Sequence, residues 1–250
     1  MMEFFKEVYY VSWADLKFMR HHFLNILISS IMSPLLYLLA FGFGLGGGME
    51  QEGVPYIAFI IPGIAALTSL SASFSSTATR INVQRLYYRS FDEMMMCPVS
   101  IPAIVVGKSM LGLIRGLVSS SIIFAIGLVL APDHLHLTPM YVITILISCF
   151  TFSLLGVTAA LLAKSHQSMA TFSSLVILPM TFLCGTFFSV ANLPAVIQAA
   201  LYALPLTHSS IATRAAALEW DFPWISLAIL IAFGIAFFLI NVYLVKNKKV

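Results

Sequence analysis

The stretch MYVITILISCFTFSLLGVTAALLA, residues 140–163, indicates the fold because it runs for 24 residues without an Asp, Glu, Lys or Arg. A bilayer has a hydrocarbon core about 30 Å thick, and a helix needs about 20 apolar residues to cross it. Sixty per cent of the chain is hydrophobic and only 9% is charged, whereas about a quarter of the residues in a soluble domain are charged. The sequence therefore predicts an all-α integral membrane protein.

Further long stretches also lack charged residues, and they fall at 21–49, 53–79, 116–132, 165–213 and 222–245. We interpret the whole chain, 1–250, as one membrane domain of six transmembrane helices, because these helices and their short connections use up its length. The predicted spans lie near 23–45, 54–77, from 101 onward, within 140–163, and near 168–190 and 223–245. Small residues in the second span, from Ser69 to Ser76, predict that this helix packs tightly inside the bundle.

The distribution of positive charge predicts the orientation of the chain, because Lys and Arg mark the cytoplasmic side of a membrane. With the N-terminus in the cytoplasm, twelve of the thirteen basic residues lie inside: Lys6, Lys17, Arg20, Arg80, Arg85, Arg89, Lys108, Arg115, Lys164, Lys246, Lys248 and Lys249. Only Arg214 falls outside. The predicted outer loops carry the acidic residues Glu50, Glu52, Asp133, Glu219 and Asp221. We expect a multi-pass protein of the cell (inner) membrane with both termini in the cytoplasm.

Three segments outside the spans have patterns of their own. Residues 4–20 place apolar side chains on one half of a helical wheel and charges on the other, with Asp15 as the exception, and this predicts an amphipathic helix at the inner leaflet. A frayed N-terminus is the alternative. Residues 80–98 form the longest predicted cytoplasmic connection, a short amphipathic helix that ends before Pro98. Residues 191–218 hold several polar residues, so we expect outer re-entrant helices before the last span.

The third span carries two basic residues, Lys108 and Arg115, seven positions apart and therefore on one face of the helix. The simplest expectation is that both side chains snorkel to the cytoplasmic headgroups.

No catalytic constellation is present in the sequence. The six histidines are scattered, so we predict no metal site, no cofactor on this chain and no enzymatic activity. The basic residues are dispersed at helix ends, which argues against nucleic-acid binding and for contact with membrane lipid. No acidic residue lies deep in a span, whereas ion-driven pumps usually keep one near mid-membrane. A transporter built this way needs an energy source outside the chain.

Three motifs in the right order make the chain resemble a known family. They are RSFDEMMMCPVS at 89–100 before Gly107-Lys108, then Tyr56 with Pro62-Gly63, and LCGTFFS at 183–189 followed by LPLTH at 204–208. Together they resemble the permease subunits of type-2 ABC exporters, a class that includes drug-efflux, lipooligosaccharide and polysaccharide export permeases. The family's Gly-x-Phe-Phe-Pro pattern has Ser189 in place of the proline here.

The resemblance implies a permease that moves an amphipathic, lipid-linked or drug-like substrate outward as a homodimer driven by two cytoplasmic ABC ATPase subunits, which bind the ATP and Mg²⁺. It implies that 80–98 is the coupling helix that contacts the ATPase, through Arg85, Tyr87, Tyr88, Arg89, Phe91, Asp92, Glu93, Met94 and Met95. A solvated charged loop is the alternative for this segment.

The resemblance also places a substrate path near spans one, two and five. The aromatic residues that would line or gate this path are Tyr37, Phe41, Phe59, Phe182, Phe187 and Phe188. Ordinary aromatic packing is the alternative for these residues. For the whole chain, the alternatives are a dedicated polysaccharide or lipooligosaccharide permease, an ion-coupled secondary transporter and a membrane scaffold.

Overall fold

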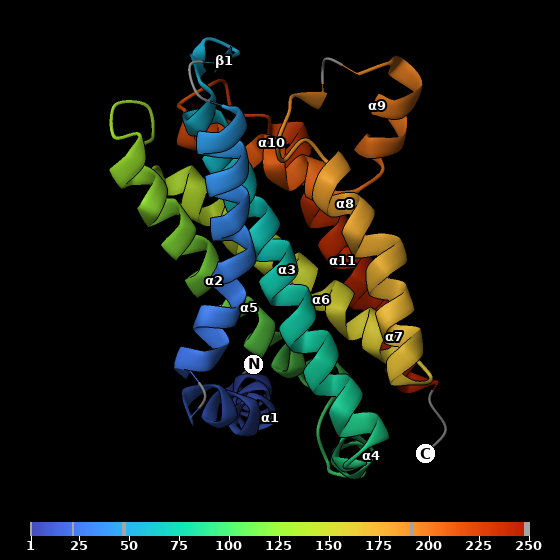
Figure 1. Cartoon of the computed structure of the whole chain (residues 1–250). Helices are drawn as coiled ribbons and strands as arrows, with labels where there is room; N and C mark the ends of the chain where they lie inside the picture. Colours follow the sequence, from blue (N-terminus) through green and yellow to red (C-terminus); the bar gives the residue numbers. More distant parts are fainter. Residues whose placement is uncertain (1, 22, 47–48, 191–192, 248–250) are drawn as a thin grey trace.

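A computed structural model describes residues 2–21, 23–46, 49–190 and 193–247 (Figure 1). The chain is 82% helical. In chain order, its elements are α1 (Met2–His21), α2 (Phe23–Tyr37), η1 (Leu38–Leu45), β1 (Glu50–Gln51), β2 (Val54–Pro55), α3 (Tyr56–Leu86), α4 (Ser90–Met95), α5 (Ile101–Leu130), α6 (Pro139–Leu162), α7 (His166–Phe172), η2 (Ser173–Ile177), α8 (Leu178–Leu183), α9 (Ala195–Tyr202), α10 (Pro205–Ala217) and α11 (Trp224–Lys246).

The predicted all-α membrane fold is confirmed. Among the described residues, five helices are long and apolar enough to cross a membrane, namely α2 with η1, α3, α5, α6 and α11. The segment predicted as the fifth span forms one unbroken helical run of α7, η2 and α8 from His166 to Leu183. Figure 1 shows this run extending beside the other spans between the two ends of the bundle.

The two ends of the bundle differ in what they carry (Figure 1). At one end lie α1, α4 and the C-terminus, and we call it the α4 end. At the other, which we call the α10 end, lie α9, α10 and a small antiparallel hairpin of β1 and β2 that pairs Glu50 with Pro55. The hairpin turn is Glu52-Gly53, and both residues adopt the positive φ angles that a tight two-residue turn requires.

Helix α3 is the centre of the fold, and its apolar span is 89% buried. Its small residues face glycines on the neighbouring helices: a Cβ added at Gly116 of α5 or at Gly156 of α6 would collide with Ser73 or with the backbone at Phe74. Thr77 and Ser153 also share a hydrogen bond of 2.7 Å between α3 and α6. Close backbone approach through small residues is how membrane helices pack, so the predicted tight packing of this helix is confirmed.

Helices α9 and α10 form a bent pair with an angle of 93° between them, at the place where re-entrant helices were predicted. Ala191 and Asn192, the first two residues of the predicted segment, lie outside the described residues. Polar side chains of α10 bind the backbone carbonyls at the end of α9, where the bend occurs. Thr207 Oγ1 donates a hydrogen bond to the Leu201 carbonyl, and His208 Nε2 lies 2.8 Å from the Tyr202 carbonyl.

Helix α1 lies across the α4 end rather than along the bundle (Figure 1). It buries Val8 and Val11 and leaves aromatic side chains such as Tyr10 and Trp13 exposed. A Cβ added at Gly107 of α5 would lie only 2.6 Å from a methyl of Val11, so the glycine permits this contact. The segment predicted to be an amphipathic helix is therefore helical and docks on α5 through its apolar side.

The segment 80–98 is not the single short helix that its sequence suggests. Helix α3 continues through Leu86, so Arg80 and Arg85 belong to it, and only α4 forms a separate turn of helix. Arg89 breaks the chain between the two helices with a φ of 55°. The prediction missed this boundary because β-branched and polar residues at the end of α3 are held helical by packing against other helices rather than by their own propensity.

Candidate functional site

Two connected hollows run along the face of the bundle formed by α2, α3 and the adjoining helices. The first, of about 440 Å³, lies toward the α4 end and is lined by Phe18, Met19, Ile26, Ser75, Ser76, Thr79, Arg80, Val83, Tyr88, Leu111 and Arg115. The second, of about 280 Å³, is lined by Ser29, Ser30, Ser33, Pro34, Tyr37, Leu67, Ser71, Ala72, Ser75, Arg115, Leu178 and Thr181. Because both contain Ser75 and Arg115, we treat them as one groove between spans one, two, three and five, and we call it the serine groove.

Arg115 lies at the junction of the two hollows. Its Nε donates a hydrogen bond of 2.8 Å to Ser30 Oγ, and Nη2 donates a longer one of 3.5 Å to the Ile26 carbonyl. Ser30 Oγ in turn donates to that same carbonyl at 2.7 Å. The side chain therefore bonds to the first two turns of α2, and the expectation that it snorkels to the headgroups stays a prediction.

Lys108, the other basic residue of the third span, is buried in an ion-pair network. Its Nζ donates to Asp15 Oδ2 and to Gln84 Oε1, both at 2.8 Å. The other Asp15 oxygen accepts from Arg80 Nε at 2.7 Å and from Gln84 Nε2 at 2.8 Å. Burial alone would raise the pKa of Asp15, but the two cations outweigh it and hold that pKa below its ordinary value. The network ties α1 to α3 and α5.

Four of the six predicted path aromatics meet at the far end of the serine groove, where they form what we call the aromatic cluster: Tyr37, Phe41, Phe182 and Phe187. The Phe41 and Phe187 rings stack at 4.4 Å, and the Tyr37 ring packs edge-on to Phe187 at 5.6 Å and to Phe182 at 6.1 Å. Since Tyr37 also lines the groove, the cluster closes the groove toward the α10 end. Phe188 is half-buried nearby in sequence, and Phe59 is fully buried in α3.

A buried arginine, Arg214 of α10, fixes the chain segment that carries the aromatic cluster. Its Nη2 donates to the carbonyls of Gly185 at 2.8 Å and Thr186 at 3.3 Å, and its Nε donates to the Phe59 carbonyl at 3.1 Å. The guanidinium also lies 3.8 Å from the centre of the Phe59 ring. We call this arrangement the Arg214 clasp, since it joins α10 to α3 and to the end of α8 through backbone atoms.

Two glycines make the clasp possible. A Cβ at Gly63 would lie 2.4 Å from the Thr186 carbonyl oxygen, so only glycine lets this carbonyl approach α3. Gly185 has a φ of +72°, a conformation that glycine adopts at little cost. These are the glycines of the Pro62-Gly63 and 183–189 motifs, and the structure gives each of them a geometric reason.

At the α4 end, the residues predicted to couple to an ATPase differ from one another in how far their side chains are exposed. Tyr87 and Tyr88 are 77% and 64% exposed, and Arg89 and Glu93 are exposed beside them. Asp92, Met94 and Met95 are half-buried. Together with the exposed Met96, these seven residues form the surface that we call the α4 surface.

Two predicted coupling residues serve the chain's own fold instead. Phe91 is 1% exposed and packs in a hydrophobic cluster with Ile81 and Ile104. The Nη1 group of Arg85 donates to the carbonyls of Ala160, Leu161 and Ala163 at the end of α6, where helix carbonyls lack partners of their own. Both residues therefore position the α4 surface and do not belong to it.

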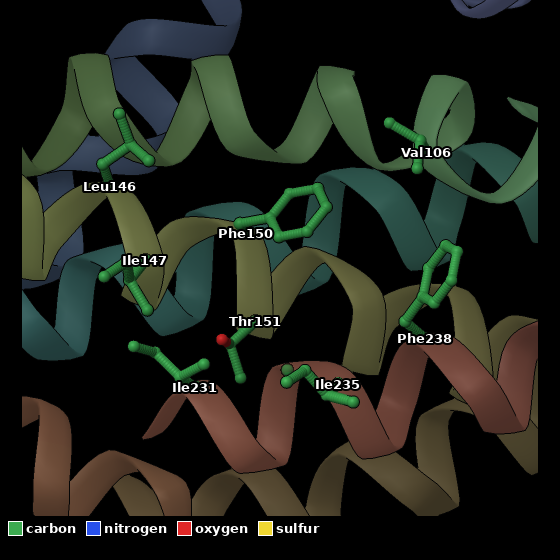
Figure 2. Close-up of a pocket in the computed structure, with 9 residues that line it drawn as sticks. Val106, Leu146, Ile147, Phe150, Thr151, Ile231, Ile235 and Phe238 are labelled. Atoms are coloured by element: carbon green, nitrogen blue, oxygen red, sulfur yellow. The ribbon is translucent and has the colours of Figure 1, made fainter. Parts of the chain in front are cut away.

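A separate apolar groove of about 540 Å³ lies between α5, α6 and α11 (Figure 2). Figure 2 shows Val106 and Phe238 at one end of it, and Ile231 and Ile235 of α11 along one wall. Thr151 is the only polar residue that lines the groove, and its hydroxyl donates to the Leu230 carbonyl at 3.5 Å. With no charge to orient a headgroup, this groove suits an acyl chain of the surrounding lipid.

The roles of Asp15 and Arg214, each of which makes three hydrogen bonds, were not predicted from the sequence. Asp15 was the one acid on the apolar side of the α1 wheel, and Arg214 was the one basic residue on the predicted outer side. Each exception to a pattern marked a buried charge. Among the described residues, no three His, Cys, Asp or Glu side chains lie close enough together to hold a metal ion.

Comparison with known proteins places this geometry in a family. The model of the ABC-2 type transporter family matches residues 6–218. The chain is 26% identical over 236 residues to the inner membrane transport permease YadH of Escherichia coli K12, with 92% of each chain covered. It is also 29% identical to nodulation protein J of Rhizobium meliloti and 28% identical to nodulation protein J of Neorhizobium galegae, with 80% of this chain and 74% and 77% of theirs covered.

The chain therefore belongs to the ABC-2 type transporter family. It is a multi-pass membrane protein and a permease subunit of an ABC exporter, a transport subunit rather than an enzyme. The resemblance seen in its sequence motifs is confirmed.

Proposed function

We propose that this permease carries an amphipathic, lipid-linked or drug-like substrate out of the cytoplasm or the inner leaflet through the serine groove. The observation that supports this most strongly is the continuity of the groove, which starts beside α1 and Arg80, passes Arg115 and ends at the aromatic cluster. The hydroxyl groups and Arg115 in its lining suit a headgroup, and the apolar side chains in its lining suit a tail. The aromatic cluster and the Arg214 clasp then form the barrier that opens during export.

The placement of charge indicates which end of the bundle faces the cytoplasm. The basic residues gather toward the α4 end, whereas Glu50, Glu52, Asp133 and Glu219 lie toward the α10 end, so we assign the α4 end to the cytoplasm. The exposed native Cys97 beside α4 provides a test. A membrane-impermeant thiol reagent applied to intact cells should label an Asp133→Cys variant in a Cys97→Ser background and should leave Cys97 of the natural chain unlabelled. The opposite pattern would reverse the orientation.

The energy for export comes, in this proposal, from two ABC ATPase subunits that bind the ATP and Mg²⁺ and contact the α4 surface. That surface combines exposed aromatic side chains with methionines and an arginine, the residue types that are enriched in protein interfaces. Asp15, the buried acid described above, lies on α1 and not inside a span. No span presents a mid-membrane acid to carry a coupling ion, which disfavours the ion-coupled secondary transporter.

A second copy of the chain completes the path in this proposal. The span formed by α2 and η1 is only 18% buried, and α8 exposes Leu178 and Phe182 beside the groove. A homodimer that places these faces opposite each other would enclose the serine groove. Its test is the mass of the detergent-purified complex, which should correspond to two permeases and two ATPases. An active complex with one permease would contradict the homodimer.

The α4 surface gives the sharpest test of the ATPase contact. A Tyr87→Ala, Glu93→Lys double variant should bind the ATPase about thirtyfold or more weakly, because losing an aromatic hot spot costs about 2 kcal/mol or more and the charge change slows docking. The measurement is the amount of ATPase that co-purifies with the tagged permease at matched permease yield.

Asp133→Lys is the matched control, since it reverses an exposed acid at the opposite end of the bundle. Wild-type capture by the double variant would show that the ATPase binds elsewhere. Phe91→Ala should instead lower the yield and stability of the permease itself, because this side chain is buried within the chain.

A further inference from the structure

Arg115 stands out because it is a cation inside the membrane bundle without a carboxylate partner among the described residues. Both ion pairs of the described part of the chain belong to Asp15, which pairs with Arg80 and Lys108. The hydrogen bonds of Arg115 go to a serine hydroxyl and a backbone carbonyl, and they use Nε and Nη2. The donors of Nη1 are left for another group in the groove.

Arg115 is part of α5, a helix long and apolar enough to cross a membrane. It follows Lys108 by seven residues, so its backbone lies about 10 Å further along the helix, while its side chain shares a hollow with Phe18 and Met19 of α1. A charged residue in a membrane span is costly unless it meets a partner or a water-filled path, and it marks a functional site by default.

The walls of the serine groove share one chemistry. None of the residues that line its two hollows is an Asp or Glu. Hydroxyl groups line the hollows instead, and those of Ser33, Ser71, Ser75 and Thr79 come from α2 and α3. Ser76 and Thr181 also line them, but their hydroxyls donate to the carbonyls of Ala72 and Ile177 in their own helices. Guanidinium and hydroxyl donors without competing carboxylates form a site for an anionic group, which accepts charge-assisted hydrogen bonds.

Apolar side chains also line both hollows, beside the span formed by α2 and η1, which is only 18% buried. Phe18, Ile26 and Leu111 line the lower hollow, and Leu67 and Leu178 line the upper one. A ligand that fits both parts has an anionic headgroup and a hydrocarbon tail. A free anion would leave these apolar walls unfilled and would have to enter the membrane without a tail.

We propose that the serine groove binds an anionic amphipath, with its phosphate-type headgroup on Arg115 and the surrounding hydroxyls. This proposal rests on the proposed function and narrows its substrate class. Arg80, at the α4 end of the same groove, is the first cation that such a headgroup meets, and its charge is shared with Asp15. Arg115 is then the site at which the headgroup stops before the aromatic cluster opens.

Protection of an introduced thiol tests this site in the permease alone. Ser75 is exposed within both hollows, so a Ser75→Cys, Cys97→Ser variant presents one reactive thiol beside Arg115, since Cys149 and Cys184 are buried. The variant is reconstituted in phosphatidylcholine nanodiscs, and its labelling rate by a thiol reagent is measured against three probes. Dodecyl phosphate is the anionic amphipath, dodecylphosphocholine has the same tail with a zwitterionic headgroup, and inorganic phosphate has no tail.

Dodecyl phosphate should protect the thiol at a concentration at least tenfold below that of dodecylphosphocholine, and inorganic phosphate should not protect it. Adding Arg115→Gln should weaken protection by dodecyl phosphate about tenfold or more, because hydrogen bonds to a charged group are lost. Arg115→Lys, which keeps the charge, should retain most of the protection. Arg89→Gln, which removes an exposed cation outside the groove, should leave it unchanged.

Equal protection by the two dodecyl probes would overturn the proposal, and that comparison needs no Arg115 variant. Protection by inorganic phosphate alone would show a free-anion site and would also overturn it. Unchanged protection in Arg115→Gln would remove Arg115 from the site. A permease that binds dodecyl phosphate in this way but shows no ATP-driven transport with its ATPase would count against the proposed function and not against the binding site.

Discussion

Replacing Asp15 with Ala is expected to lower the free energy of unfolding by about 3–5 kcal/mol, the typical cost of leaving a buried charge unpaired. Asp15 is 1% exposed, and among the described residues it is the one acid that forms an ion pair with Lys108, whose side chain is 6% exposed. Without the carboxylate, Lys108 loses its counter-charge and α1 loses its polar link to α3 and α5. The melting temperature of the purified permease should fall accordingly.

The controls separate charge from general damage to α1. Glu3→Ala removes an exposed acid from the same helix and should change the melting temperature little. A double variant, Asp15→Leu with Lys108→Met, should recover much of the loss, because replacing a whole buried pair by apolar side chains is often neutral or stabilising. A melting temperature for Asp15→Ala equal to that of the wild type would contradict the buried network.

Replacing Arg214 with Met is expected to have the second large effect, a loss of about 2 kcal/mol or more, because hydrogen bonds from a charged group contribute about 1.5–3 kcal/mol each. The carbonyls of Gly185 and Thr186 would lose their donor, and the segment that carries Phe187 would be freed from α10. Native Cys184, which is fully buried beside the clasp, is a direct reporter. Its labelling rate by a thiol reagent should rise along with the fall in melting temperature.

Lys164→Met is the matched control, since Lys164 is exposed in a loop at the other end of the bundle. It should affect neither the melting temperature nor the reactivity of Cys184. Arg214→Lys should behave much like Arg214→Met, since one ammonium group cannot reproduce the fork of donors that spans three carbonyls. An unreactive Cys184 in Arg214→Met would show that the clasp does not hold this segment.

The spans could be predicted from sequence because the cost of leaving backbone and charged groups in lipid is large and local. The 139–162 helix illustrates this, since the absence of charge over its length limits it to a membrane. The boundary at Arg89 could not be predicted, because it depends on a left-handed backbone turn at a residue other than glycine. Packing against other helices determines this helix boundary, and no local sequence pattern indicates it.

Much of the site depends on contacts between residues far apart in the chain. The Tyr37 and Phe187 rings of spans one and five are in contact, and their role in a substrate path stays a prediction. Phe91 looked like a surface anchor because the sequence cannot show which side of a six-residue helix faces the bundle. The hydrogen bond between Arg115 and Ser30 could not be predicted because these residues lie 85 positions apart.

ATP-driven movement of a fluorescent phosphatidic acid tests the central claim most directly. Proteoliposomes would contain the permease and its ATPase, and the fraction of label that an impermeant quencher can reach would be followed after ATP is added. The account predicts that ATP moves the label away from the leaflet on the ATPase side, that Tyr87→Ala with Glu93→Lys abolishes this movement, and that Asp133→Lys leaves it intact. Movement at the same rate without ATP, or movement that persists in the Tyr87→Ala, Glu93→Lys variant, would contradict it.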